Sequence, residues 1–337
     1  MPAMRLGFAV KVLGRPDLPS NDARRHQNNP HLRVSIGYLR AIFGYLREIG
    51  VTMYRMSSDI APYCTHPDMP RFHGQIAECA DDLAQLGAEA REQGLRLSLH
   101  PSQYIVINSP DEALVAKSVA DLVAQAAILD AMGLGPEAVV VLHVGGVYDD
   151  REASIERFIR AYERLPEAVR RRLVLENDDT RFSVGDVLRI HAATGVPLIY
   201  DYQHHMCNNR EQMGVAEALR AALLTWPAGV RPKIHLSTPR TELKTVQRKN
   251  RTTGKAEDVL QPPQWTNHAD YVNPFECIHV LRSVPDLPFD VMLECKLKDV
   301  TLLRLREDLA RYAPDVALRF GIEPRDGAPP LAPGEED

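Results

Sequence analysis

Short apolar runs alternate with longer amphipathic segments along almost the whole chain. The short runs are rich in Val, Leu and Ile, which is typical of strands buried on both faces of a parallel sheet. Eight such runs predict strands over Arg5–Val10, Thr52–Ser57, Arg96–His100, Ala138–Val144, Arg172–Asn177, Pro197–Asp201, Arg231–Ser237 and Phe289–Cys295. The longer segments carry apolar residues at helical spacing. They predict helices over Ser35–Ile49, Gln75–Gln93, Asp111–Met132, Ala153–Leu165, Val184–Ala193, Gln212–Leu224, Glu276–Val284 and Leu302–Tyr312.

Each predicted strand is followed by a predicted helix. This order favours an α/β fold, a single (β/α)8 TIM-barrel domain, over the alternative of a doubly wound open sheet. With 337 residues, 45% of them hydrophobic, the chain can bury one large core. We expect the barrel to span residues 1–323. The tail, residues 324–337, is rich in Pro, Gly and acidic residues, and we expect it to be disordered.

The charge and cysteine content exclude some classes of protein. A net charge of −5 gives no overall basic field, so a polyanionic partner would have to be held by a local patch or by bound cations. The five cysteines contain no CxxC pair, which argues against a disulfide framework or a zinc knuckle. Neither a signal peptide nor a membrane-spanning run is apparent. We expect a cytoplasmic monomer with no membrane partner and no obligate protein partner.

Six predicted strands end on an imidazole or a carboxylate. These residues are His100, His143, Glu176, Asp201, His235 and Glu294. In a barrel the carboxyl ends of all strands meet at one mouth, so these side chains are expected to share a cavity. Unpartnered buried imidazoles and carboxylates are costly, whereas divalent cations would compensate their charge. Each residue alone can also be structural, a hydrogen-bonded histidine or a cap of the next turn.

Two further histidines extend this set. His204 lies in the predicted loop just beyond Asp201, and His268 lies in the long connection after the seventh strand, Pro239–Pro274. So many ligands indicate two or three ions, with Glu176 and Asp201 as bridging carboxylates. Ions about 3.5–4 Å apart suit phosphoryl chemistry, because they activate a water and stabilise the leaving oxygen. The mixed ligands permit Zn, Mn or Fe without choosing among them.

Two loops carry residues suited to DNA. The Pro239–Pro274 connection contains a basic run that includes Arg240, Lys244, Arg248 and Lys249. Such residues would contact the phosphates of a nucleic-acid backbone, although a solvated charged loop would look the same. Beyond His100, Gln103 and Tyr104 are expected on the rim, where they would stack on bases or push between them. Tyr104 packed within its own loop is the alternative.

Eight motifs carry a resemblance to a known family. They are SSDIAPYCTH (Ser57–His66), LSLHPSQY (Leu97–Tyr104), VLHVGG (Val141–Gly146), LENDD (Leu175–Asp179), YDYQHH (residues 200–205), KIHLS (Lys233–Ser237), HADYV (His268–Val272) and MLECKLKD (Met292–Asp299). Over about residues 5–323 the chain resembles the UV damage endonucleases, which share a barrel and a trinuclear metal site with the endonuclease IV group. The resemblance implies a cut immediately 5′ to UV photoproducts, cyclobutane pyrimidine dimers and 6-4 photoproducts. It further implies 3′-hydroxyl and 5′-phosphate products and Mn²⁺ as the metal, with Zn²⁺, Mg²⁺ or Fe²⁺ as alternatives.

The resemblance also implies roles for particular residues. The implied metal ligands are His100, His143, Glu176, Asp201, His204, His235, His268 and Glu294. Glu176 is also expected to be catalytic, Lys233 matches a lysine that can be carboxylated, and His66 matches a histidine near the scissile bond. Gln103 and Tyr104 match the pair that probes the lesion from the opposite side of the duplex.

One part of the family pattern differs. The family's first strand carries a tyrosine and then an asparagine, where this chain has Phe8 and Val12. Our hypothesis is a metal-dependent lesion endonuclease acting on damaged double-stranded DNA. Two alternatives stay open: a sugar isomerase or epimerase of the same barrel type, which would turn over a free sugar, and a non-catalytic lesion-binding protein, which would bind irradiated duplex without cutting it.

Overall fold

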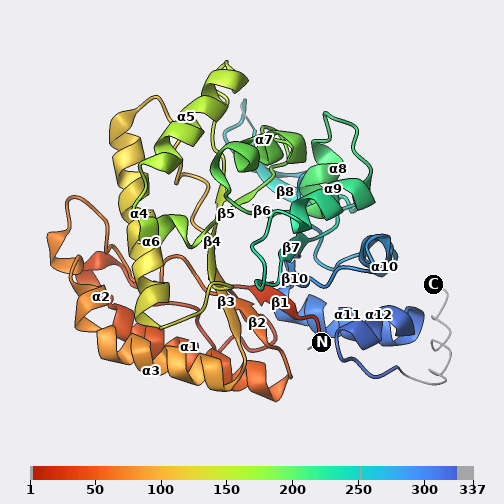
Figure 1. The fold of residues 1–337 in the computed structure, drawn as a ribbon, viewed down its shortest axis with the longest axis horizontal. Coiled ribbons are helices and arrows are strands. Elements are labelled where there is room, and N and C mark those ends of the chain that lie inside the picture. Colours follow the sequence, from red (N-terminus) through yellow and green to blue (C-terminus); the bar gives the residue numbers. More distant parts are fainter. Residues whose placement is uncertain (1–2, 251, 325–337) are drawn as a thin grey trace.

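Eight parallel strands form one sheet at the centre of the protein (Figure 1). The computed structural model describes residues 3–250 and 252–324, so nearly all of the predicted 324–337 tail lies outside the described residues. The strands are β1 (Leu6–Ala9), β2 (Met53–Arg55), β3 (Arg96–Leu99), β4 (Val139–His143), β5 (Leu173–Glu176), β6 (Leu198–Ile199), β7 (Lys233–Leu236) and β10 (Asp290–Leu293). Their spatial order is β6-β5-β4-β3-β2-β1-β10-β7. Each of the eight predicted strands is confirmed.

The two outer strands of this order, β6 and β7, meet and close the sheet into a barrel. Asp201 forms a parallel bridge to His235, and the backbone N–H of His235 donates to the carbonyl oxygen of Tyr200 at 2.9 Å. The fold is therefore the predicted TIM barrel and not an open doubly wound sheet. Closure of the barrel also places two candidate ligands, Asp201 and His235, side by side.

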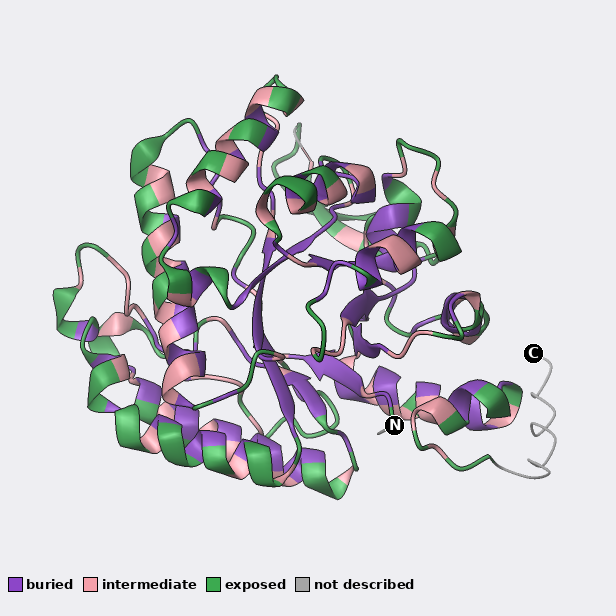
Figure 2. Cartoon of the chain, in the orientation of Figure 1, coloured by how far each residue is buried: buried purple, intermediate pink, exposed green. Residues whose placement is uncertain are grey.

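Helices surround the barrel, with their buried faces toward the strands (Figures 1 and 2). They are α1 (Leu32–Glu48), α2 (Gln75–Glu78), α3 (Ala80–Glu92), α4 (Glu112–Ala131), α5 (Arg151–Glu163), α6 (Glu167–Arg170), α7 (Val184–Thr194), α8 (Tyr202–Cys207), α9 (Val215–Leu223), α10 (Pro274–Ser283), α11 (Lys298–Tyr312) and α12 (Pro314–Arg319). The single helix predicted over Gln75–Gln93 is divided at Cys79 into α2 and α3. Three short helices, α6, α8 and α12, were not predicted. No helix of the described residues is long and apolar enough to cross a membrane.

Alternate strand residues line the barrel interior. In β4, Val139 and Val141 belong to a small buried cluster that includes Val174 of β5, whereas the residues between them pack into the main core. Because successive side chains of a strand point to opposite faces, His143 and Glu176 face the interior, two positions after Val141 and Val174. The pleat of the strands thus aims the ligand side chains into the mouth of the barrel.

The connection after β7 is not a plain loop as predicted. It contains a two-stranded antiparallel hairpin, β8 (Lys244–Lys249) and β9 (Ala256–Gln261). Both strands are almost entirely exposed. With solvent on both faces, the hairpin has no alternation of apolar and polar residues, and that alternation is the sequence signal of a strand.

Candidate metal centre

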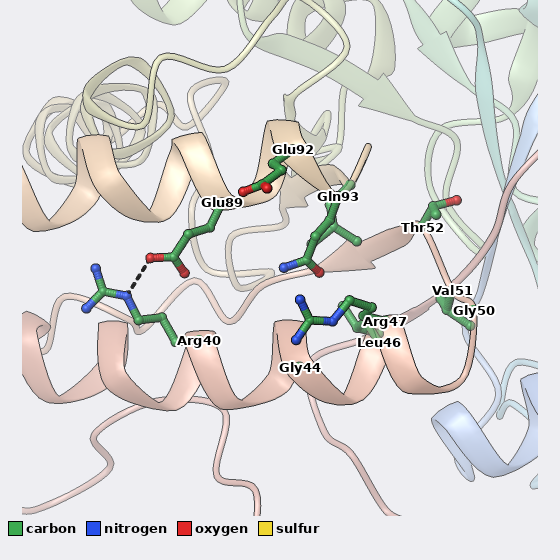
Figure 3. A pocket seen from close by; sticks show the side chains of 11 residues that line it. Arg40, Gly44, Leu46, Arg47, Gly50, Val51, Thr52, Glu89, Glu92 and Gln93 are labelled. Atoms are coloured by element: carbon green, nitrogen blue, oxygen red, sulfur yellow. Dashed lines mark hydrogen bonds and ion pairs between the residues drawn. The ribbon is translucent and has the colours of Figure 1, made fainter.

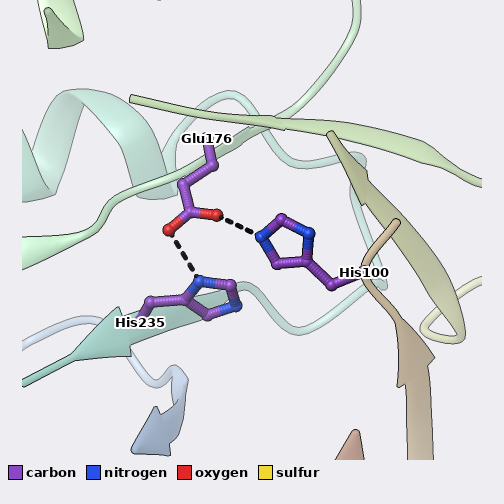
Figure 4. A group of neighbouring side chains, drawn as sticks. All are labelled: His100, Glu176 and His235. Carbon is purple, nitrogen blue, oxygen red and sulfur yellow. Dashed lines mark hydrogen bonds and ion pairs between the residues drawn. The ribbon is translucent and has the colours of Figure 1, made fainter. Parts of the chain in front are cut away.

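The six strand-end residues that were predicted to converge do converge. Glu176 is at the centre of the group, with no exposed surface. Its two carboxylate oxygens lie 2.9 Å from Nε2 of His100 and 2.9 Å from Nδ1 of His235 (Figure 4). Nε2 of His143 lies 3.6 Å away. Three imidazoles from β4, β7 and the end of β3 therefore surround one buried carboxylate from β5.

Two more carboxylates complete the cluster. Oε1 of Glu294 lies 3.3 Å from Nδ1 of His235. Glu176, Asp201, His235 and Glu294 form a group whose ligand atoms all lie within 4.8 Å of one another. His100, Glu176 and His235 form a second such group. Because the two groups share Glu176 and His235, the arrangement suits neighbouring cations joined by a shared carboxylate.

His204 lies on a helix and not in the predicted loop. Asp201 caps the first turn of α8, since its Oδ1 accepts a hydrogen bond of 2.7 Å from the backbone N–H of His204. Nδ1 of His204 lies 3.5 Å from Glu176. The ring centre of His204 lies 5.8 Å from that of His143 and 6.1 Å from that of His268. The cap thus explains how residues three apart in sequence both face the cluster.

Hydrogen bonds at Nδ1 fix the free nitrogen of two of these rings. Nδ1 of His100 lies 3.0 Å from the carbonyl oxygen of Pro101, and Nδ1 of His204 lies 2.9 Å from that of Asn177. A carbonyl oxygen only accepts, so both Nδ1 atoms carry the hydrogen and both Nε2 atoms of the neutral rings offer a lone pair. For His100 that lone pair would face a carboxylate oxygen of Glu176 at 2.9 Å, an arrangement that requires a proton or a cation.

Several buried polar atoms of the cluster have no hydrogen-bond partner within the described residues. They are Oδ2 of Asp201, Nε2 of His235 and Nδ1 of His143. Such orphaned atoms are rare and costly in folded proteins. Cations with imidazole and carboxylate ligands would satisfy them, so the donor set fits divalent transition metals.

The shifted pKa values of the cluster also fit a cation site. Burial, reinforced by the negative charges of Glu176 and Glu294, raises the pKa of Asp201 to about 8. Burial disfavours the charged ring of His204, but Asp201 and Glu176 outweigh it and raise its pKa to about 10. Burial also opposes ionisation of Glu176, yet His235 and His143 hold its pKa well below the usual value. Asp201 and His204 thus bind protons where a cation could otherwise compensate the negative charge of the cluster, while Glu176 stays ionised.

Lys233 lies inside the barrel, two residues before His235 in β7. Its side chain is fully buried, and Nζ has no hydrogen-bond partner among the described atoms. Burial and the positive charges of Arg96 and Arg55 lower its pKa well below the usual value, which favours the neutral amine. A neutral buried amine fits the predicted carboxylation.

Arg55 was missed at the sequence level. It ends β2 and forms an ion pair with Glu294, with 13% and 10% of the two side chains exposed. The ion pair fixes one candidate ligand from across β1, which lies between β2 and β10. The predicted second strand continued to Ser57, so Arg55 lay inside it and carried no signal as a strand-end residue.

The predicted DNA-contacting residues separate into two environments. Gln103 and Tyr104 are exposed beyond β3, Tyr104 with 73% of its surface accessible. Lys244, Arg248 and Lys249 are exposed on the β8–β9 hairpin. The environment of Arg240 is different, because only 7% of it is exposed. It directly follows Pro239, which forms an antiparallel bridge with His268.

The remaining predicted residues lie in β1 and in the loops after β1 and β2. His66 is partly exposed, with its ring 6.3 Å from that of Tyr63. Phe8 and Val12 are buried, and Phe8 packs edge-on against Tyr54 at 5.4 Å. The positions where the family pattern has polar side chains are thus part of the apolar core in this chain.

A hollow of about 580 Å³ between α1 and α3 lies away from this cluster (Figure 3). It is lined by Gly50, Val51 and Thr52, which precede β2, so it is at the amino ends of the strands. Its Arg40 and Glu89 neutralise each other at 3.0 Å. Catalytic sites of TIM barrels lie at the opposite, carboxyl face, which favours the His/Glu/Asp cluster as the functional site.

Comparison with known proteins agrees with this geometry. A family model described as UV-endonuclease UvdE matches residues 27–318. A UV DNA damage endonuclease of Bacillus velezensis is 32% identical over 264 residues, which cover 77% of this chain and 76% of the relative. One of Bacillus cereus is 32% identical over 285 residues, which cover 83% of this chain and 82% of the relative.

Solved structures support the same conclusion. The crystal structure of SacUVDE is similar with a TM-score of 0.72 and 28% identity, covering 91% of this chain and 98% of that one. D-psicose 3-epimerase from Clostridium cellulolyticum H10 has a TM-score of 0.51 at 13% identity, covering 87% of this chain and 85% of that one. The second likeness shows a shared fold alone. With a family model that matches most of its length, the chain belongs to the UV-endonuclease UvdE family.

Proposed function

We propose that this protein cuts UV-damaged double-stranded DNA immediately 5′ to the photoproduct, leaving a 3′-hydroxyl and a 5′-phosphate. Its family and its similarity to UV DNA damage endonucleases support the reaction class. The proposed substrates are cyclobutane pyrimidine dimers and 6-4 photoproducts. The observation that carries the proposal is the buried His/Glu/Asp cluster at the carboxyl ends of the strands, with its unsatisfied ligand atoms.

The proposed metal ligands are the eight residues of the cluster and its rim. They are His100, His143, Glu176, Asp201, His204, His235, His268 and Glu294. We propose two or three ions, with Mn²⁺ as the metal and Glu176 and Asp201 as the shared carboxylates. Bound divalent ions would supply a water of lowered pKa and neutralise charge on the phosphate oxygens.

The protein's own residues supply the rest of the site. Arg55 holds Glu294 in place through their ion pair. Lys233 is the proposed site of carboxylation: its neutral amine would attack carbon dioxide and lose a proton, which adds a negative charge beside the cluster. His66, in the loop after β2, is the proposed contact near the scissile bond.

The rim supplies selectivity for the lesion. Tyr104, whose ring is exposed beyond β3, would push between bases beside Gln103. A photoproduct weakens stacking, so opening the duplex costs less there than in intact DNA. The exposed cations of the β8–β9 hairpin, Lys244, Arg248 and Lys249, would contact phosphates, which carry no sequence information.

A cleavage assay tests the proposal directly. Purified protein with Mn²⁺ is incubated with an end-labelled duplex that contains one pyrimidine dimer and, separately, with the undamaged duplex. A cut directly 5′ to the dimer, suppressed by a chelator, is the expected result. Turnover of a free sugar without DNA binding would instead establish an epimerase, and tight binding to irradiated duplex without a cut in any divalent metal would establish a lesion-binding protein.

A further inference from the structure

A chain of hydrogen bonds through two buried side chains connects His268 to the segment that precedes it. Nδ1 of His268 lies 2.6 Å from Oγ of Ser237, and Oγ of Ser237 donates to Oε1 of Gln203 at 2.6 Å. Nε2 of Gln203 donates to the backbone carbonyl oxygen of Trp265 at 2.8 Å. Gln203 and Ser237 have no exposed surface. The chain thus joins α8, the end of β7 and the segment that carries His268.

The direction of every hydrogen bond in this chain is determined. The carbonyl oxygen of Trp265 can only accept, so the amide nitrogen of Gln203 faces it and the amide oxygen faces Ser237. Oε1 of Gln203 can also only accept, so it takes the single proton of the Ser237 hydroxyl. Oγ of Ser237 then has no proton left for His268 and must accept, which places the ring hydrogen of His268 on Nδ1. Nε2 of the neutral ring keeps a free lone pair.

His268 differs from the other histidines in how its ring is fixed. Nδ1 of His100 and Nδ1 of His204 face backbone carbonyl oxygens. A carbonyl oxygen can only accept a hydrogen bond, so these two tautomers do not depend on any neighbouring side chain. Nδ1 of His268 faces a hydroxyl, which can either donate or accept. Only Gln203 removes that ambiguity.

We propose that Gln203 is a positioning residue: through Ser237 it holds His268 as the tautomer with a free Nε2 and so prepares it to bind a cation. The inference rests on the proposed metal site. A partner that orients a ligand histidine in this way commonly contributes 10–100-fold to metal affinity. Gln203 itself touches neither the cation nor the substrate, because both ends of its amide are occupied within the protein.

Wild-type protein provides the first test, which no folding defect can obscure. The metal-free protein is labelled with ¹⁵N-histidine, and the ring nitrogen shifts of His268 are assigned by comparison with His268→Gln. A protonated Nδ1 and an unprotonated Nε2 are expected. The opposite tautomer, or a mixture of the two, would overturn the proposal.

Two variants then test the consequence for binding of Mn²⁺ alone, measured by calorimetry in the absence of DNA. Gln203→Met keeps the length of the side chain but removes both hydrogen bonds, and Ser237→Ala removes the hydroxyl. Each is expected to weaken one class of Mn²⁺ site about 10–100-fold. The matched control is Gln85→Met, an exposed glutamine on α3, which should bind Mn²⁺ as wild type does.

A double variant that combines Gln203→Met with Ser237→Ala distinguishes the positioning role of Gln203 from a general loss of protein stability. Because Gln203 acts on His268 only through Ser237, the double variant should bind Mn²⁺ no more weakly than Ser237→Ala. Additive losses, or unchanged Mn²⁺ affinity in the folded single variants, would refute the proposal while the metal site itself stood. Failure of wild type to bind Mn²⁺ at all would refute both the inference and the proposed metal site.

Discussion

Replacing Glu176 with glutamine removes the negative charge at the centre of the cluster and keeps the shape of the side chain. The carboxylate lies 2.9 Å from one nitrogen each of His100 and His235, with His204 at 3.5 Å and His143 at 3.6 Å. The amide keeps one accepting oxygen but presents an N–H to one of the imidazoles. It would also be unable to bridge the proposed cations as a carboxylate does.

The size of the effect follows from these contacts. Each charge-assisted hydrogen bond contributes about 1.5–3 kcal/mol. Removing the charge from both of the two shortest contacts therefore costs up to about 3–6 kcal/mol, or up to about 10²–10⁴-fold at about 1.4 kcal/mol for each factor of ten. We expect incision by Glu176→Gln to fall by at least about 10²-fold.

The assay measures incision of the dimer-containing duplex under single-turnover conditions, with binding to the same duplex measured separately. Binding should be largely retained, because the proposed DNA-contacting residues lie on the rim and not at the base of the cluster. The matched control is Glu89→Gln, which removes a partly buried ion pair between α1 and α3, away from the cluster, and should cut at the wild-type rate. Full activity of Glu176→Gln would refute the assignment of this cluster as the catalytic site.

Three further predictions concern protons, the lesion and the DNA backbone. Asp201 and His204 hold protons at pH 7, because their pKa values are raised to about 8 and about 10. Mn²⁺ should displace these protons, so calorimetry in buffers of different ionisation enthalpy should show release of about two protons at pH 7. The affinity for Mn²⁺ should fall as the pH falls below about 10, and more steeply below about 8. A constant affinity from pH 6 to pH 9 would contradict this. Tyr104→Ala should lower the preference for damaged over intact duplex about 5–150-fold, as expected from about 1–3 kcal/mol of lost stacking, whereas an unchanged ratio in competition binding would place the ring outside the DNA interface. Exchange of both Lys244 and Lys249 for Ala should weaken binding to damaged and to intact duplex alike, and should reduce the slope of log affinity against log salt by up to about 2. An unchanged slope would mean that the hairpin does not touch phosphates.

The sequence predicted most of the cluster because strand residues alternate locally. The polar residue that ends an apolar run, such as His143 or Glu176, can be recognised directly in the sequence. The alternation of strand residues then determines which face of the sheet that residue occupies. Six ligand candidates could therefore be assigned to one barrel mouth before any distance was known. The same local reasoning passed over Gln203, because a glutamine between two metal-ligand candidates carries no signal of its own.

Tertiary contacts decided the environments that local patterns do not encode. Arg240 belongs to a basic run with Lys244, yet the bridge between Pro239 and His268 leaves Arg240 buried while Lys244 stays exposed on the hairpin. The predicted loop at His204 is a helix, because Asp201 accepts a hydrogen bond from its backbone N–H. These outcomes depend on which backbone and side-chain atoms meet in the folded protein.

The sequence by itself determined the barrel, the number of its strands and the residues at their carboxyl ends. Periodicities of two and of about 3.6 residues act over a few residues and can be seen without a fold. Only the tertiary structure decided that β6 and β7 meet and that the nitrogens of His100 and His235 lie 2.9 Å from one carboxylate. It alone also decided that the Nδ1 atom of His268 faces the Ser237 hydroxyl. Distances and proton positions depend on atoms far apart in the chain, and folding brings those atoms together.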